Sequence, residues 1–271
     1  MLAFLSKPTF AVFLILLLVA AYPVTSPADH SWGSYHWART SNPITLKLGD
    51  NLSPAWDSYL GTSSYDWSLS AVLNTDIVPG LTKPRNCRSS SGRVEVCNYT
   101  YGRNGWLGVA QIWTNGSHIV QGVVKLNDTY FNTASYNSPA LKNLVMCQEI
   151  GHAFGLDHQD EDFYNAPLGS CMDYSNDPFP NQHPNDHDYL QLELIYGHND
   201  AVIATVNATD PTPLANQAPS MTSGDFEKTT QWGKLIRSSK HSRTELYALD
   251  LTRGHKVFTF VIWAEAGIRG K

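Results

Sequence analysis

The segment that most constrains this chain reads MCQEIGHAFGLDH and carries polar side chains at fixed spacings. Gln148 and His152 are four residues apart, so on a helix their side chains lie on the same side, one turn apart. Glu149 falls on an adjoining face. Gly155 can leave the helix with a positive φ at little steric cost, and such a turn would bring His158 back toward the same point. We therefore expect an amide, two imidazoles and a carboxylate to converge, as in a zinc site with one irregular ligand.

This spacing resembles the signature of the metzincin zinc metallopeptidases, H-E-x-x-H-x-x-G-x-x-H followed by a Met-turn. The second part of the match is SCMDY, shortly downstream, where Met172 resembles the Met-turn methionine. Tyr174 matches a tyrosine that contacts the metal or the transition state in some metzincins, and packing in the core is an equal alternative. The first metal position departs from the family, because it is Gln148 in place of histidine.

The resemblance implies a matrixin-like α+β fold, with a mixed twisted sheet, an active-site helix and the Met-turn. It also implies a zinc-dependent endopeptidase that acts on a protein or peptide substrate. Gln148, His152 and His158 would bind Zn2+, and Met172 would pack beneath the metal. Zinc in such a site lowers the pKa of its water, and Glu149 would act as the general base that takes the proton and later passes it to the leaving amine.

The glutamine at the first metal position leaves three interpretations open. The amide oxygen of Gln148 could bind zinc as a neutral and weaker donor than imidazole. Another histidine, such as His183 or His187, could instead supply the missing ligand. In the third interpretation the protein is a catalytically weak or inactive binding protein that keeps the fold. We favour the enzyme, because the fold alone does not require a base such as Glu149 beside the metal.

Four cysteines fit an oxidising compartment and allow three pairings. A Cys87–Cys97 disulfide would close a short polar loop. A Cys147–Cys171 disulfide would join the active-site helix to the Met-turn segment. The alternative makes Cys147 a zinc thiolate, but its side chain is rotated by about 100° around the helix from that of Gln148.

The first 26 residues read as a secretory signal peptide. Lys7 precedes an uncharged apolar run at 10–21, which is short for a bilayer span and is followed by small residues. An uncleaved membrane anchor is the alternative. The net charge of −5 offers no basis for nucleic-acid binding, and we expect a secreted, extracellular monomer with no stable membrane anchor. Asn-x-Ser/Thr sequons that fit secretion as a glycoprotein begin at Asn51, Asn98, Asn115, Asn127 and Asn207.

An acidic cluster lies beside the expected third zinc ligand. Its members are Asp157, Asp160, Glu161 and Asp162. The cluster could bind Ca2+ or support the ligand through hydrogen bonds, and a solvated acidic loop is the interpretation we favour.

A length of 271 residues accommodates one domain of about 150–200 residues and an extension. A hydrophobic content of 42% is enough for a core. We assign 30–200 to the metzincin-like catalytic domain and 201–271 to a linker and a small β-rich C-terminal extension. Three prolines in 208–223 indicate the linker, and strand-like stretches follow it. No cysteine stands in 22–42 to act as a cysteine switch, so this extension is also a candidate for latency.

Alternation of apolar and polar residues predicts the strands, and Ser-Pro pairs predict the starts of two helices. The expected strands are 43–48, 94–99, 107–113 and 119–126, and the expected helices begin at Ser53, Ser138 and Asn185 or Asp186. The stretch 107–126 resembles the strands that precede the metal helix in matrixin-like domains. In that family an edge strand here binds extended peptide by adding it to the sheet.

Overall fold

A computed structural model describes residues 30–200, 229–239 and 243–264 of this chain. The expected signal peptide, the proline-containing linker and the sequon at Asn207 lie outside these ranges. Within them, no helix combines the length and the apolar character needed to cross a bilayer.

The described strands form one sheet in which parallel and antiparallel pairs are mixed. Its order is β3-β2-β4-β6-β5-β9-β8-β7, and β1 pairs with β6 beside this path. The parallel pairs join β1, β2, β3, β4 and β6, and the antiparallel pairs join β5 to β6 and continue through β9, β8 and β7. The strands are β1 (His36–Trp37), β2 (Ile44–Asn51), β3 (Leu73–Pro79), β4 (Arg93–Tyr99), β5 (Trp106–Asn115), β6 (His118–Asn127), β7 (Lys234–Ser238), β8 (Thr244–Asp250) and β9 (His255–Trp263).

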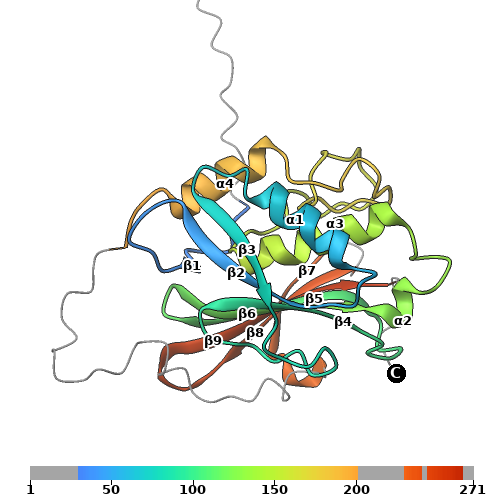
Figure 1. Ribbon diagram of the computed structural model, residues 1–271, viewed down its shortest axis with the longest axis horizontal. Helices are drawn as coiled ribbons and strands as arrows, with labels where there is room; N and C mark the ends of the chain where they lie inside the picture. Colours follow the sequence, from blue (N-terminus) through green and yellow to red (C-terminus); the bar gives the residue numbers. More distant parts are fainter. Residues whose placement is uncertain (1–29, 201–228, 240–242, 265–271) are drawn as a thin grey trace, which may run out of the picture.

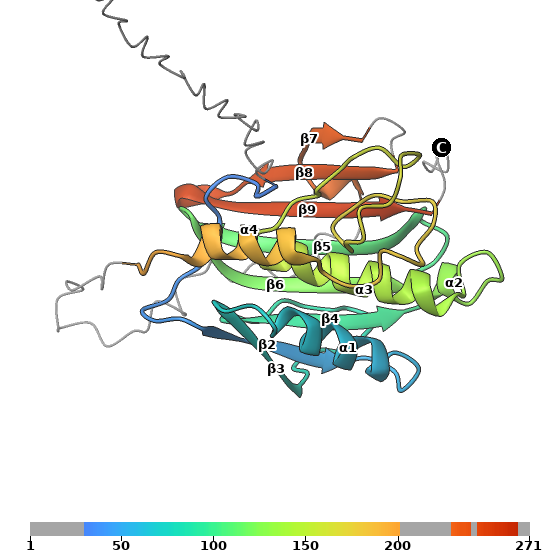
Figure 2. The same ribbon diagram turned by 90° about the horizontal axis from the view of Figure 1, so that it is seen from above.

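Helices α1, α3 and α4 lie together on one face of this sheet (Figures 1 and 2). The helices are α1 (Asp57–Trp67), α2 (Asp128–Phe131), α3 (Pro139–Ala153) and α4 (Asp186–Tyr196), with 3-10 turns η3 (Thr229–Gln231) and η4 (Thr252–Gly254). A mixed sheet covered by separate helices is an α+β fold, as the sequence predicted.

Side-chain caps explain where two of the helices begin. The Ser138 hydroxyl accepts a hydrogen bond from the Leu141 amide, with Pro139 in the first turn, as predicted. The Asn185 side chain caps α4 and forms a capping box with Asp188. The predicted start of the first long helix at Ser53 is wrong by several residues, because α1 begins at Asp57 after a turn.

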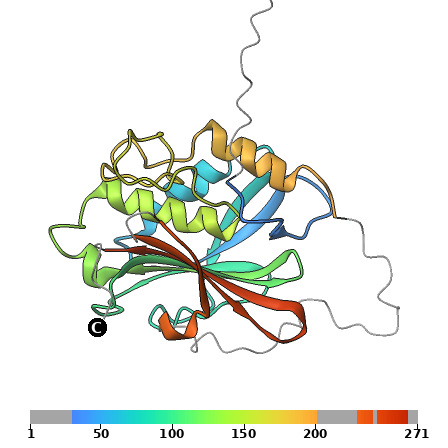
Figure 3. The same ribbon diagram turned by 180° about the vertical axis from the view of Figure 1, so that it is seen from behind.

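The C-terminal strands belong to the same sheet as the strands that precede α3. Figure 3, which views the molecule from behind, shows them continuing that sheet. β9 pairs along β5, from Trp106 opposite Trp263 to Asn115 opposite His255. Successive side chains of a strand point to opposite faces, and here both faces are covered. Three β9 residues join the core beneath the helices and three join a second core on the other face: Phe258, Phe260 and Ile262, then Val257, Val261 and Trp263.

This pairing corrects the expectation of a peptide-binding edge within 107–126. Both β5 and β6 have a neighbour on each side, and the described path ends at β3 and at β7 instead. The physical reason is that β9 buries apolar side chains on both faces, so it is held as an interior strand.

The sequons differ in their exposure. Asn51, Asn98 and Asn127 are buried, so an attached glycan would have no room in the folded chain. Asn115 is exposed at the turn between β5 and β6.

Because β9 is buried on both faces, we expect it to contribute strongly to the stability of the fold. Phe260 is 1% exposed, so Phe260→Ala is expected to lower the free energy of unfolding by about 3–5 kcal/mol in denaturant titrations. Phe179→Ala is the matched control, because that ring is 75% exposed and its loss should change stability by about 0.5 kcal/mol or less. Equal effects of the two substitutions would contradict the interior position of β9.

Candidate metal centre

The end of α3 is shaped by one glycine. The Gly155 amide bonds to the His152 carbonyl at 3.1 Å, and the residue takes a φ of +99°. A Cβ at this position would also collide with the carbonyl oxygen of Tyr35. Glycine is therefore required twice over, by conformation and by space, and the turn returns the chain so that His158 faces His152.

The two imidazoles meet through their Nε2 atoms, which are 3.0 Å apart. The Nδ1 atom of His152 lies 2.9 Å from the Leu156 carbonyl oxygen, which can only accept, so Nδ1 carries the proton of the neutral ring. Its Nε2 then presents a lone pair toward His158. The Tyr174 hydroxyl lies 2.6 Å from Nδ1 of His158 and orients the second ring.

Burial keeps both rings neutral. It lowers the pKa of His152 well below its usual value, and the neighbouring His158 adds to the effect. Burial also lowers the pKa of His158, against the opposing pull of the Asp157 carboxylate. A neutral imidazole is the form that binds a metal ion.

Glu149 lies on the adjoining face of α3, against β5. Gly108 makes room for it, because a Cβ there would collide with the Glu149 carboxyl group. Burial raises the pKa of Glu149 well above its usual value, and a hydrogen bond from the Ala110 backbone partly offsets that rise. Its Oε2 atom is buried without a hydrogen-bond partner in the described part of the chain, which is an unusual state for a carboxyl oxygen.

Gln148 is buried, and its amide group is held in a single orientation. The Nε2 atom donates to the Cys171 carbonyl oxygen at 2.9 Å. Because that partner can only accept, the amide oxygen is the end of the side chain left to bind a cation or another donor.

The segment around Met172 packs directly on α3. A Cβ at Gly151 would meet the sulfur of Met172 and the ring of Trp67, so both side chains lie against the helix backbone one residue before His152. The Cys147–Cys171 disulfide joins the same two segments, and Cys87–Cys97 forms the second bridge. Cys147 is therefore not available as a thiolate ligand.

The acidic cluster meets an arginine from the C-terminal strands. Arg237 on β7 contacts the Asp157 carboxylate and lies 3.0 Å from that of Glu161. Burial by itself would raise the pKa of Asp157, but hydrogen bonds with His158 and Arg237 lower it below its usual range. A fixed guanidinium thus compensates two of the four carboxylates, and a calcium site here stays a prediction.

The C-terminal strands also cover the histidine pair. Phe260 on β9 stacks on the His152 ring, with centroids 4.2 Å apart and planes 8° from parallel. Only a void of about 10 Å³ remains, bounded by His158, Tyr174 and residues of β7, β8 and β9. Sequence reasoning missed this cover, although the unbroken apolar run at the end of β9 is typical of a strand buried on both faces.

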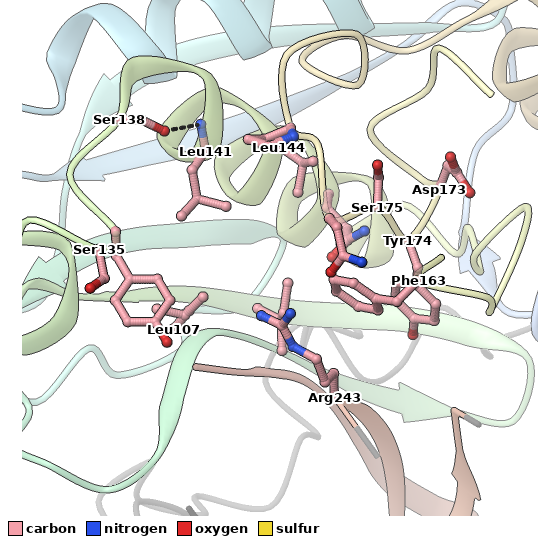
Figure 4. Close-up of a pocket in the computed structure, with 15 residues that line it drawn as sticks. Leu107, Ser135, Ser138, Leu141, Leu144, Phe163, Asp173, Tyr174, Ser175 and Arg243 are labelled. Atoms are coloured by element: carbon pink, nitrogen blue, oxygen red, sulfur yellow. Dashed lines mark hydrogen bonds between the residues drawn. The ribbon is translucent and has the colours of Figure 1, made fainter. Parts of the chain in front are cut away.

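A larger cavity, of about 300 Å³, lies on the other side of Tyr174. Figure 4 shows Leu141 and Leu144 of α3 on one wall and Arg243 reaching in from the opposite side. Gln148 is also part of the lining. The cavity therefore brings a space lined by both apolar and polar side chains up to the irregular member of the expected ligand set.

The two other histidines considered as substitute ligands have partners of their own. Nδ1 of His183 lies 2.6 Å from the Asp66 carboxylate, and the His187 ring stacks on His30 with centroids 4.7 Å apart.

The likeness of this chain to known proteins is weak. No protein-family model matches the chain, and no curated protein matches its sequence. Among solved structures, myroilysin is similar at a TM-score of 0.35 and 14% identity, over 61% of this chain and 87% of that one. High choriolytic enzyme 1, a hatching enzyme zinc-protease from the medaka fish Oryzias latipes, is similar at a TM-score of 0.34 and 13% identity, over 61% and 96%. Likenesses this weak decide nothing about function.

The turn after α3 can be tested with a matched pair of glycines. Gly155→Ala should lower the free energy of unfolding by more than about 1 kcal/mol, because it adds a collision to the strain of a positive φ. Gly102 has a similar φ of +94° with open space around it, so Gly102→Ala should carry the strain alone. Urea titrations compare the two, and a larger loss for Gly102→Ala would contradict the contact with Tyr35.

The buried Glu149 makes stability depend on pH in a definite direction. Its folded-state pKa is raised, so the folded chain holds this proton more tightly than the unfolded chain, and stability is lost as pH rises above the ordinary carboxyl pKa. In metal-free protein, the free energy of unfolding of Glu149→Gln should therefore rise relative to that of the unchanged chain. The rise should be up to about 1.4 kcal/mol per pH unit above the ordinary carboxyl pKa. The control is Glu193→Gln, which alters an exposed residue. The difference between its free energy of unfolding and that of the unchanged chain should not follow pH in this way. A flat difference for Glu149→Gln would show that the carboxyl group is solvated.

Proposed function

We propose that this protein is a secreted zinc-dependent endopeptidase. The observation that carries the proposal is the convergence of the His152 and His158 Nε2 atoms, which lie 3.0 Å apart at the end of the helix that also carries Glu149. A tetrahedral zinc ion holds neighbouring nitrogen ligands about 3.3 Å apart, so the observed spacing is close to that of two ligands of one ion.

The residues present fit a zinc ion. Gln148 would complete the set through its amide oxygen, since its amide nitrogen is engaged by Cys171. The Leu156 carbonyl and the Tyr174 hydroxyl would hold the two rings in their ligating orientation. The ion, when bound, would acidify a water molecule and polarise the scissile carbonyl.

Glu149 would be the general base of the reaction. It would accept the proton of the attacking water and return it to the leaving amine. Burial raises its pKa, which suits a carboxyl group that must hold a proton between these two transfers. The cavity beside Gln148 would receive a side chain of the substrate, with Leu141 and Leu144 supplying apolar contacts.

Secretion is part of the proposal. Two disulfides suit an oxidising compartment, and residues 1–26 have the composition of a signal peptide. Among the sequons in the described ranges, exposure favours Asn115 as the glycosylated site.

A catalytically inactive binding protein is the second candidate function. A catalytic zinc site keeps one position open, yet here Phe260 covers the His152 ring and β9 occupies the edge of β5. The ring nitrogens of the two histidines also have hydrogen-bond partners without an ion. For the enzyme to act, the C-terminal strands would have to move away from the histidine pair.

Digestion of unfolded casein in the presence of zinc separates the two candidates. The enzyme should cleave casein, lose cleavage on chelation and lose about 10²–10⁴-fold of its rate in Glu149→Ala, the contribution of a general base. Gln148→His should bind zinc more tightly, since imidazole is the stronger donor.

The opposite result is equally definite. If the unchanged chain is silent and Gln148→His is active, the glutamine has disabled a peptidase site and the binding-protein function is correct. Glu193→Ala serves as the control for handling and expression, because its side chain is exposed on α4.

A further inference from the structure

Four side chains from distant parts of the chain meet around one carboxylate group. We call them the Asp200 cluster: His36 on β1, His118 at the start of β6, and His198 and Asp200 beyond α4. The Oδ1 atom of Asp200 lies 3.0 Å from Nε2 of His36, 3.4 Å from Nε2 of His118 and 3.9 Å from Nε2 of His198. One carboxylate oxygen thus faces three imidazole nitrogens.

The tautomer of His36 makes this contact unusual. Its Nδ1 atom lies 2.6 Å from the Ser34 carbonyl oxygen, which only accepts, so Nδ1 must donate. In the neutral ring, Nε2 then presents a lone pair to the Asp200 carboxylate, and two acceptors face each other at 3.0 Å. Such a contact needs a positive charge between or on the two groups, which is either an extra proton on the ring or a metal ion.

The carboxylate is held in place from its other side. The Arg39 backbone amide donates to Oδ2 of Asp200 at 2.8 Å, and the guanidinium lies 3.5 Å from the same atom. The Arg39 backbone amide and guanidinium both stabilise the ionised form of this carboxylate. Oδ2 is therefore occupied, and Oδ1 remains directed at the histidines as an ionised ligand atom.

The dimensions suit one small cation. Ligand atoms of His36, His198 and Asp200 all lie within 4.8 Å of one another. A tetrahedral zinc ion places its ligand atoms about 3.3 Å apart, and the contacts of the Asp200 Oδ1 atom with the three imidazoles run from 3.0 to 3.9 Å. The two rings that pack around His36 stand nearly perpendicular to it, at 87° for His118 and 79° for His198, so the three rings approach from different directions.

We propose that His36, His118, His198 and Asp200 bind a divalent transition-metal ion, with zinc as the preferred ion. His36, His198 and Asp200 supply three ligands, and His118, whose Nε2 lies 3.4 Å from Oδ1 of Asp200, would complete a tetrahedral set, which is typical of a structural ion rather than a catalytic one. The Ser34 carbonyl and Arg39 orient the ligands through their other atoms. No ligand is shared with the α3 histidines, so the inference does not rest on the proposed function.

The ion would join three segments that are far apart in the sequence. His36 lies in the N-terminal segment, His118 at the turn between β5 and β6, and Asp200 where the chain leaves α4. Binding to the folded chain alone would raise its stability. The side chains of His118 and His198 are 31% and 59% exposed, which gives the ion a path of entry.

The test is a zinc titration of metal-free, full-length protein, read by a chromophoric chelator and by thermal unfolding. The variant is His118→Gln with His198→Gln, which leaves Asp200 and Arg39 intact. The control removes two other histidines from outside both centres, His183→Gln with His255→Gln. The variant should bind one zinc equivalent fewer than the unchanged chain and lose most of the zinc-induced rise in Tm, while the control should match the unchanged chain.

Equal stoichiometry and an equal rise in Tm for the variant and the unchanged chain would overturn the proposal and leave the cluster as a protonated ion pair. The variant must first match the unchanged chain in circular dichroism without zinc. If it does not, His198→Gln alone replaces it, because that ring is the most exposed of the three, and the same loss of the zinc-induced rise in Tm is expected. Cobalt titration gives an independent readout, since visible absorption of tetrahedral Co2+ should weaken in the variant and persist in the control.

Discussion

The packing of α3 against β5 and β6 is the contact on which the candidate centre depends. Buried apolar side chains of the helix set its height above the sheet, and Gly108 and Gly151 allow the close approach on two sides. That approach buries Glu149 against β5 and places Met172 against the helix backbone. The Cys147–Cys171 disulfide then joins the segment around Met172 to the same helix. Apolar packing thus positions the polar residues, because their side chains have little conformational freedom once the helix is packed on the sheet.

The same packing creates a conflict between stability and access. β9 completes the core beneath the helices through Phe258, Phe260 and Ile262, and its opposite face completes a second core. An interior strand of this kind stabilises the sheet, but it also places an aromatic ring on His152. Removing the strand would expose two apolar surfaces at once. Opening the histidine pair to a substrate would therefore cost the free energy that the strand contributes to folding.

The two histidine centres differ in the way they meet the electrostatic cost of burial. At the end of α3, the imidazoles are neutral and stabilise each other through a hydrogen-bonded chain that runs from Leu156 to Tyr174. In the Asp200 cluster, a full negative charge faces the rings, and Arg39 compensates only the outer oxygen. The two rings of the first centre have hydrogen-bond partners without a cation, whereas the second centre has two acceptors in contact and therefore attracts one.

The sequence by itself determined what local spacing controls. Residues four apart on a helix must share a face, a glycine must stand where φ is positive, and a serine before a proline must cap α3, so Gln148, His152, Gly155 and the start of the helix were predictable from the chain. The α+β class followed from the motif and the alternating strands. Only the tertiary structure decided that β9 pairs with β5, that Phe260 and Arg237 cover the histidines, and that His36, His118 and Asp200 meet. These contacts join residues 80 or more positions apart. Which distant segments become neighbours is set by the packing of the whole sheet, which no local spacing records.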